Sequence, residues 1–436
     1  MAKQLAIIAD DFTGSNDTGV QFSKKGLKTV VSFELDKIKK ISGQTDVVVV
    51  DTESRADEKK VAYEKVYKVA KNLKYQNIDY IYKKLDSTLR GNIGSEIEGA
   101  MEGGGYDIAI VAPALPANGR KTIGGNQFVH DIPLEKTEIA EDPVTPVKYS
   151  YVADIIGEQT EKEIGVINIK DVIQGKDNLL DKLIDQVKAG KSIIVIDSIS
   201  KKDLDVVAET INEFDRKCLL VGSAGFAESL PEALELTTQD KKEYRMSGAV
   251  AGIVGSVSDI SREQINYARE YIDGLTVIDV NLENVLNNDF ESEITRIRNE
   301  INSKLKSNKD VIIRSAKERQ MVEKARKIGG DNGLSEREVS GKIAQFMGQM
   351  ARELYFNKEI KALFMTGGDI AIKSASIIGA EASNIVDEVL PGIPLSYLAG
   401  EDLPQKPVVT KAGAFGENEA IAEIFYFLRK WNEDEK

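Results

Sequence analysis

The chain has 436 residues, too many for one ordinary hydrophobic core, so two domains are expected. Its 58 basic and 71 acidic residues give a net charge of −13, which argues against non-specific binding to nucleic acid or to an anionic membrane. One cysteine excludes an internal disulfide, and one histidine argues against most zinc sites and a Ser-His-Asp triad. The sequence shows neither a signal-peptide pattern nor an apolar run long enough to span a membrane, so we expect a cytoplasmic protein.

The first half alternates predicted strands and helices. Residues 4–10 form a short apolar run typical of a buried strand, and polar residues follow it at 10–17, ahead of a helical pattern that reaches residue 26. The run at 46–52 is almost entirely β-branched, as in parallel strands covered on both faces. The other elements predicted in this half are strands at 29–33, 80–82, 107–112, 163–169, 192–197 and 218–223, and helices at 57–74, 93–101, 150–160, 179–190, 200–214 and 224–234.

Two segments of the first half depart from this alternation. Residues 124–147 contain prolines and alternate irregularly, which predicts a β-ribbon or flap over a cleft. The triplet Gly190-Lys191-Ser192 is similar to part of a P-loop, but Asp185 stands where the first P-loop glycine should be, and a strand follows instead of a helix. We interpret Gly190 as the glycine that ends a helix.

A polar, charged segment at 237–248 interrupts the pattern, and such composition shifts mark linkers. We therefore place the boundary near residue 240, with domains at 1–240 and 241–436. The second half is predicted to contain strands at 249–255, 275–280, 310–315, 361–366 and 407–411, and helices ending near 271 and at 290–307, 335–355, 370–379 and 418–430. The third of these helices starts with a capping box of Ser335 and Glu338. Both halves are thus predicted to be α/β, each with a mainly parallel sheet flanked by helices.

The segment YIYKKLDSTLRGNIG at 80–94 is the first candidate site. It starts as an apolar strand and then presents cations, hydroxyls and one carboxylate, as open α/β sheets do at their strand ends. Lys84 and Arg90 could clamp a carboxylate, while Asp86 could accept a hydroxyl proton. These side chains predict a site for a small, hydroxylated anion.

Polar residues at two other strand ends would join this site if the strands are neighbours. They are Asp10 and Asp11 after the first strand, and Arg55 after the strand at 46–52. The structural alternatives are that Asp10 or Asp11 caps the following helix, and that Arg55 is a solvated surface residue.

Three strand ends in the second half carry small residues and glycine just before a helix: GSVSD at 255–259, TGGDIA at 366–371 and KAGAFGENEA at 411–420. Glycine allows a close backbone approach to an anion, and a helix N-terminus offers free N–H groups. Together the three turns predict a phosphate-lined nucleotide site. No G-x-G-x-x-G motif follows a strand, which counts against an NAD-dependent dehydrogenase.

The sequence resembles the four-carbon acid sugar kinase family over nearly its whole length. In the first half the resemblance rests on IIADDFTGSNDTG at 7–19, KKLDSTLRGNIG at 83–94, APALPANGRKTIGG at 112–125 and DPVTPV at 142–147. In the second half it rests on GSVS at 255–258, MTGGDIA at 365–371 and VVTKAGAFG at 408–416.

The resemblance implies an acid-sugar domain and a nucleotide domain that face each other across a cleft holding the active site. It implies a kinase that uses ATP to phosphorylate threonate, erythronate or 3-oxo-tetronate. The chemistry of phosphoryl transfer adds the expectation that Mg²⁺ takes part and that the terminal hydroxyl accepts the phosphoryl group. The implied substrate-binding residues are Asp11, Arg55, Lys84, Asp86, Ser87 and Arg90, and the strand-end reasoning adds Asp10. The implied ATP-binding residues are Ser258, Thr366, Gly367, Gly368, Asp369 and Gly413, and the turn at 255–259 adds Ser256.

Several points stay open at this level. Asp86 and Asp11 are both candidates for the general base, and Asp369 is a candidate partner of Mg²⁺ with no direct metal ligand assigned. A dehydrogenase or epimerase acting on sugar acids, and a sensor that binds the acid without consuming ATP, are the competing functions. The sequence does not select one four-carbon acid or its stereoisomer, and it leaves the oligomeric state open.

Overall fold

The computed structural model describes residues 3–33, 45–76, 78–142, 144–236, 248–255, 258–287, 289–305, 309–413 and 415–430. The chain divides into two compact units, an N-terminal unit of residues 1–240 and a C-terminal unit of residues 241–436. Most of the predicted linker, residues 237–247, and the predicted ATP-binding residue Ser256 lie outside the described residues.

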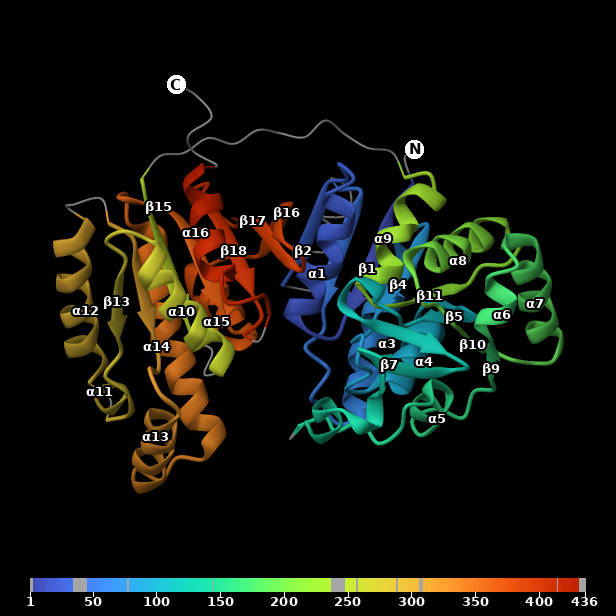
Figure 1. The fold of residues 1–436 in the computed structure, drawn as a ribbon, viewed down its shortest axis with the longest axis horizontal. Coiled ribbons are helices and arrows are strands. Elements are labelled where there is room, and N and C mark those ends of the chain that lie inside the picture. Colours follow the sequence, from blue (N-terminus) through green and yellow to red (C-terminus); the bar gives the residue numbers. More distant parts are fainter. Residues whose placement is uncertain are drawn as a thin grey trace. The chain divides into compact units, whose positions relative to one another are not determined.

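The N-terminal unit is built on a parallel sheet, as the sequence predicted (Figure 1). Its apolar, largely β-branched strands are buried on both faces, which is why they read as continuous apolar runs. In spatial order they are β2 (Thr29–Ser32), β3 (Val47–Asp51), β1 (Leu5–Ala9), β4 (Tyr80–Lys84), β11 (Leu219–Gly222), β5 (Ala109–Ala112), β10 (Ile193–Ile196) and β9 (Ile164–Ile167).

Helices cover both faces of this sheet. On one face α3 packs on α4, and α4 on α5; another group packs in the order α1, α9, α8 and α7. The apolar side chains of the first group form one core with β1, β3, β4 and β5. The helices are α1 (Phe12–Ser23), α3 (Lys59–Tyr75), α4 (Ile93–Gly104), α5 (Val152–Gly157), α6 (Ile169–Val172), α7 (Lys176–Lys188), α8 (Lys201–Glu213) and α9 (Ala224–Ala233).

The predicted ribbon is present as a small antiparallel sheet of β6 (Arg120–Ile123), β7 (Asn126–Val129) and β8 (Ile132–Pro133). It begins four residues before the predicted start, and residues 134–141 form short 3₁₀ turns rather than strands. The rejected P-loop triplet lies between α7 and β10, where Gly190 has φ +80° and reverses the chain, as expected for a glycine that ends a helix.

The C-terminal unit also has a mainly parallel sheet. Its parallel strands are β13 (Thr276–Asp279), β14 (Val311–Arg314), β12 (Ala249–Val254), β15 (Ile360–Thr366) and β18 (Pro407–Lys411), in that spatial order. The helices are α10 (Asp259–Tyr271), α11 (Leu282–Leu286), α12 (Phe290–Leu305), α13 (Arg319–Asp331), α14 (Glu336–Phe356), α15 (Gly368–Ile378) and α16 (Ala420–Lys430). The predicted capping box of Ser335 and Glu338 at the start of α14 is confirmed.

Several elements of this unit were not predicted. The antiparallel strands β16 (Ala382–Leu390) and β17 (Ile393–Ala399) extend the sheet beyond β18, joined by a turn in which Gly392 has φ +75°. The helices α11 and α13 were also missed. In α13 the apolar residues are few and only Ala325 and Gly329 are buried among its described residues, so the segment is mostly polar in the sequence.

Candidate functional site

Three adjacent strands position the polar residues of the N-terminal unit. β1 pairs in parallel with β3 on one side and with β4 on the other, in a register that places Ala9 beside Asp51 and Ile8 beside Lys83. The carboxyl ends of these strands therefore meet at one edge of the sheet. The expected adjacency is confirmed, and it brings the loops after residues 9, 51 and 84 together.

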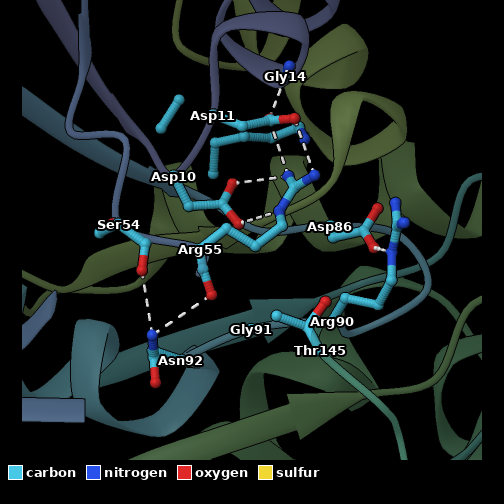
Figure 2. A network of polar contacts seen from close by, with 12 residues as sticks. Asp10, Asp11, Gly14, Ser54, Arg55, Asp86, Arg90, Gly91, Asn92 and Thr145 are labelled. Carbon is cyan, nitrogen blue, oxygen red and sulfur yellow. Dashed lines mark hydrogen bonds and ion pairs between the residues drawn. The ribbon is translucent and has the colours of Figure 1, made fainter. Parts of the chain in front are cut away.

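Arg55 binds both aspartates at the end of β1 (Figure 2). Its Nε and Nη2 donate to the two oxygens of Asp10 at 2.7 and 3.0 Å, and its Nη1 donates to Asp11 Oδ2 at 2.7 Å. The Asp10 side chain is 1% exposed, whereas that of Asp11 is 28% exposed. Asp11 also caps α1 by accepting the N–H of Gly14 at 2.8 Å, so the capping alternative is correct for Asp11 alongside the ion pair.

A second ion pair lies beside the first (Figure 2). Arg90 Nε donates to Asp86 Oδ2 at 2.6 Å, and the same oxygen accepts the Thr88 hydroxyl at 2.5 Å. Arg90 Nη1 also contacts Asp142 at 3.3 Å, in the DPVTPV motif. Two of the guanidinium nitrogens of Arg90 are thus engaged by carboxylates of the protein itself.

The two lysines at the end of β4 have different surroundings, because successive strand residues point to opposite faces of the sheet. Lys83 Nζ pairs with Glu96 of α4 at 2.8 Å, and Ser54 donates to the other oxygen of Glu96 at 2.6 Å. Lys84 is 4% exposed, and the described residues give its ammonium no hydrogen bond or ion pair. It lies against the first turn of α1, since a Cβ built on Gly14 would come 2.9 Å from Lys84 Nζ.

The charges give the aspartates different proton affinities. Burial raises the pKa of Asp10, but the positive charges of Arg55, Lys83 and Lys84 outweigh it and hold that pKa below the ordinary value. Burial raises the pKa of Asp11, and the neighbouring charge of Asp10 adds to this, so that pKa stays raised despite Arg55 and Lys84. For Asp86, burial is outweighed by Arg55 and Arg90, which hold the pKa of that carboxyl well below its usual range.

A pocket of about 250 Å³ lies within the N-terminal unit beside Arg55. Gly91, Asn92 and Thr145 line it together with Arg55 (Figure 2). The side chain of Asn92 donates to the carbonyls of Ser54 and Asp57 at 3.0 and 2.9 Å and so fixes the chain around Arg55. Gly91 has φ +94°, and a Cβ there would come 2.9 Å from Arg55 Cγ, so a side chain at this position would displace the guanidinium.

In the C-terminal unit, two of the three predicted glycine turns meet. Ser258 caps α10, and the hydroxyls of Ser258 and Ser261 donate to the carbonyl of Gly413 at 3.2 and 2.6 Å. The third turn is close in the sheet, because β15 pairs with β18 and the N–H of Gly367 donates to the carbonyl of Lys411 at 3.1 Å. Gly367 has φ +99° at the start of α15, and the buried hydroxyl of Thr366 has no partner among the described residues.

Two side chains that the sequence reasoning missed hold the loop after β18. Lys411 Nζ donates to the carbonyls of Ala412, Gly413 and Phe415 at 2.9–3.1 Å. Gln264 Nε2 donates to the carbonyls of Phe415, Gly416 and Glu417 at 2.9–3.0 Å. Because a trans peptide directs its N–H away from its C=O, the N–H groups of Gly413, Gly416 and Glu417 point away from Lys411 and Gln264. Such a loop can present N–H donors to an anion.

The described residues contain no group of three or more His, Cys, Asp or Glu side chains placed to hold a metal ion. Mg²⁺ in nucleotide sites needs only one or two protein carboxylates, because phosphates and water supply the other ligands. Asp369, in the first turn of α15, is a carboxylate of this kind and fits such a role. Among the described helices, none has the length and apolar character required to cross a membrane.

Comparison with known proteins connects both halves to one family. Residues 5–230 match the family model described as a sugar-binding N-terminal domain, and residues 251–421 match the one described as a nucleotide-binding C-terminal domain. A D-threonate kinase from Salmonella typhimurium is 34% identical over 431 residues, which cover 98% of this chain and 99% of that protein. The chain belongs to the four-carbon acid sugar kinase family.

Other relatives in this family act on different acids according to their names. A D-erythronate kinase from Heliobacterium modesticaldum is 33% identical, with coverage of 98% of this chain and 97% of the relative. A 3-oxo-tetronate kinase from Methylobacterium radiotolerans is 25% identical, with coverage of 95% and 97%. A solved structure from Salmonella typhimurium has a TM-score of 0.82 at 21% identity and covers 97% of this chain and 98% of its own, which supports the fold alone.

Proposed function

We propose that this protein is an ATP-dependent kinase that phosphorylates a four-carbon sugar acid, either threonate, erythronate or 3-oxo-tetronate, at its terminal hydroxyl. Membership of the four-carbon acid sugar kinase family supports the reaction class. The observation that carries the proposal is the polar cluster at the ends of β1, β3 and β4, where paired carboxylates adjoin the unpartnered ammonium of Lys84. This combination suits a ligand with both hydroxyls and a negative charge.

The acid-sugar site is proposed to lie in the N-terminal unit, with Asp10, Asp11, Arg55, Lys84, Asp86, Ser87 and Arg90 as its residues. Asp10 and Arg55 form a rigid, bidentate pair that orients Asp11. Lys84 provides positive charge for the carboxylate. Arg90 can add its remaining nitrogen, since Nε and Nη1 already bind Asp86 and Asp142.

Between the two candidates for the general base, we propose Asp11. A base works best when its pKa is near the working pH, and the pKa of Asp11 is raised whereas that of Asp86 is strongly lowered. Asp11 is also the more exposed member of the Arg55 cluster. Asp86 instead holds Arg90 in place through its hydrogen bond and ion pair.

The nucleotide site is proposed to lie in the C-terminal unit, around Ser256, Ser258, Thr366, Gly367, Gly368, Asp369 and Gly413. The backbone N–H groups of the loop after β18 and the N-terminus of α15 suit phosphate oxygens. Bound Mg²⁺, with Asp369 as a partner, would neutralise charge on the transferred phosphoryl group. Transfer requires the two bound ligands to meet, and the interdomain cleft expected from the resemblance stays a prediction, as does the cytoplasmic location.

A coupled ADP-release assay over a panel of four-carbon acids tests this function directly. We expect ADP release with at least one D- or L-threonate, D-erythronate or 3-oxo-tetronate, and a product that carries phosphate on the terminal oxygen. Calorimetric binding of an acid with no ADP release at any acid concentration would favour the sensor alternative. Thermal stabilisation by NAD but not by ATP would favour the dehydrogenase.

A further inference from the structure

The cations near the strand ends of the N-terminal unit differ in whether they have a carboxylate partner. Arg55 binds Asp10 and Asp11, Lys83 binds Glu96, and Arg90 binds Asp86 and Asp142. Within the part of the chain that the structure describes, two buried or half-buried cations close to this cluster have no carboxylate within ion-pair distance, whereas the exposed Lys59 binds a backbone carbonyl. These two cations are Lys84 and Arg120.

Arg120 is the first residue of β6, in the ribbon whose next strand, β7, is bound to the loop of Asp86 and Arg90. The backbones of Leu115 and Arg120 pair across a short turn, and Arg120 Nη1 donates to the carbonyl of Asn118 in that turn. Its Nε is buried, and no acceptor among the described residues binds it. On the next strand, Gln127 donates to the carbonyl of Ser87 at 2.7 Å, which attaches the ribbon to the loop of Asp86 and Arg90.

The attachment of the ribbon through Gln127 is the geometric link to this loop, and charges of the loop also act on Arg120. Burial lowers the pKa of Arg120, the negative charge of Asp86 raises it, the positive charge of Arg90 lowers it again, and the negative charge of Asp17 adds a smaller rise. A guanidinium stays protonated in proteins, so it cannot relieve its burial by losing the proton. A half-buried arginine with an unfilled donor beside an already paired Asp86 is therefore suited to an anion that the protein does not supply.

We infer that Arg120, together with Lys84, binds the carboxylate of the acid substrate. The fork of an arginine matches a carboxylate with two parallel hydrogen bonds, whereas the Lys84 ammonium adds a compact point charge. The inference rests on the proposed function, and it assigns the carboxylate to a residue outside the set expected from the sequence. It also reduces Arg90 to a partial contributor, because Asp86 and Asp142 occupy two of its nitrogens.

The carboxylate is a better candidate than a nucleotide phosphate for this anion. The C-terminal unit has its own candidate phosphate-binding groups, in the loop after β18 and at the start of α15. Arg120 and Lys84 both belong to the N-terminal unit, beside the residues that suit hydroxyls. Separate KM values for the acid and for ATP distinguish a carboxylate of the acid from a phosphate of the nucleotide as the anion that Arg120 binds.

The test compares R120Q and R120K with the control K121Q. Lys121 is the next residue of β6, but its ammonium pairs with Asp131 of the ribbon at 2.8 Å. K121Q therefore removes one positive charge from the same strand without removing a cation of the proposed carboxylate site. For R120Q we expect kcat/KM for the preferred acid to fall about 100-fold. For the neutral tetrol that has CH₂OH in place of the carboxylate, we expect a change within about threefold, because the lost pair is absent there. R120K should lie between R120Q and the wild type, and K121Q should match the wild type.

Two results would overturn the inference. A rise in KM for ATP with no change for the acid would mean that Arg120 binds a phosphate. Equal losses for the acid and the tetrol, together with a lower unfolding temperature, would mean that Arg120 is structural. We expect instead that ligand-free R120Q unfolds at or above the wild-type temperature, since an unpartnered charge is removed, and that the stabilisation by the acid is lost.

Calorimetric titration of the acid into nucleotide-free protein separates this inference from the kinase proposal. Wild-type protein that binds an acid but releases no ADP contradicts the kinase proposal alone, and weaker acid binding by R120Q would still support the role of Arg120. Equal binding of the acid by R120Q and the wild type contradicts the role of Arg120 alone.

Discussion

Lys83 and Glu96 form an ion pair of 2.8 Å in which the side chains are 1% and 2% exposed. The pair is buried next to the candidate site, because Ser54, the neighbour of Arg55 in the chain, donates to the second oxygen of Glu96. Removing one member of such a pair leaves an isolated buried charge, whereas replacing both members by apolar residues of similar size can be nearly neutral.

The first prediction concerns this pair. K83M should lower the free energy of unfolding by about 3–5 kcal/mol, and the double variant K83M/E96L should recover most of the loss. Urea denaturation of the two single variants and the double variant gives the coupling free energy directly. Additive losses would contradict a coupled pair. K59M is a suitable control, because among the described residues the exposed Lys59 ammonium binds no carboxylate and donates to the carbonyl of Glu158.

The second prediction concerns the base. D11N should lower kcat about 10²–10⁴-fold. In the wild type kcat/KM should fall as the pH drops through the raised pKa of Asp11, which lies above the ordinary value of 3.8, because the protonated carboxyl cannot accept a proton. D11N should lack this acid limb. D86N, which frees Arg90, should mainly raise KM for the acid and keep the fall of kcat/KM at low pH. If D86N loses this fall and D11N keeps it, Asp86 is the base.

The third prediction concerns the loop after β18. K411M removes three hydrogen bonds to loop carbonyls and should raise KM for ATP about tenfold. Burial lowers the pKa of Lys411 to about 7, and a neutral amine has two N–H donors for three acceptors. The wild-type KM for ATP should therefore rise as the pH increases through about 7, and K411M should not show this dependence.

Lys406 provides the control for Lys411. Burial lowers its pKa to about 8, and its ammonium donates to the carbonyls of Leu354 and Asn357, away from the loop. K406M should lose stability but keep the wild-type KM for ATP. Parallel changes in K406M and K411M would show that general destabilisation explains both.

The fourth prediction concerns Gly14. A Cβ at this position would come 2.5 Å from Asp11 Oδ1 and 2.9 Å from Lys84 Nζ, so G14A should displace both groups and reduce kcat/KM at least tenfold. Its thermal stability should change little, because the better helix propensity of alanine offsets a weakened cap, each about 1 kcal/mol. G341A in α14, where the new Cβ would have no described atom within 4 Å apart from its chain neighbours and the adjoining helix backbone, should gain about 0.4–1 kcal/mol and keep full activity.

Much of the fold was predictable because the periodic signals are local. The β-branched run at 46–52 and the apolar run at 4–10 both became central parallel strands. The adjacency of β1, β3 and β4 followed from the layout of open α/β sheets, and it brought Arg55 onto Asp10 and Asp11. The hairpin of β16 and β17 was missed, because its apolar pattern is interrupted by register shifts around Asp387 and Leu390.

The partners of the cations could not be predicted, because local sequence patterns do not show which distant residues come into contact. The alternation of strand residues indicates that Lys83 and Lys84 point to opposite faces, but it does not say that α4 brings Glu96 to one of them. Arg120 stands in the segment APALPANGRKTIGG, yet its return to the loop of Asp86 depends on the ribbon folding back. Lys411 and Gln264 act on backbone carbonyls, for which the sequence carries no signal.

Asp197, directly after β10, binds the ribbon to the sheet. Its carboxylate accepts the N–H groups of Gly124 and Gly125 at the ribbon turn, at 2.5 and 2.8 Å, and that of Ile169 at the start of α6, at 2.9 Å. A single side chain thus satisfies amides from two distant segments, and those amides lose protection together when it moves. After correction for their intrinsic exchange rates, the amides of Gly125 and Ile169 should show one common free energy of opening, so that the ribbon carrying Arg120 belongs to the cooperative unit of the sheet and does not move independently.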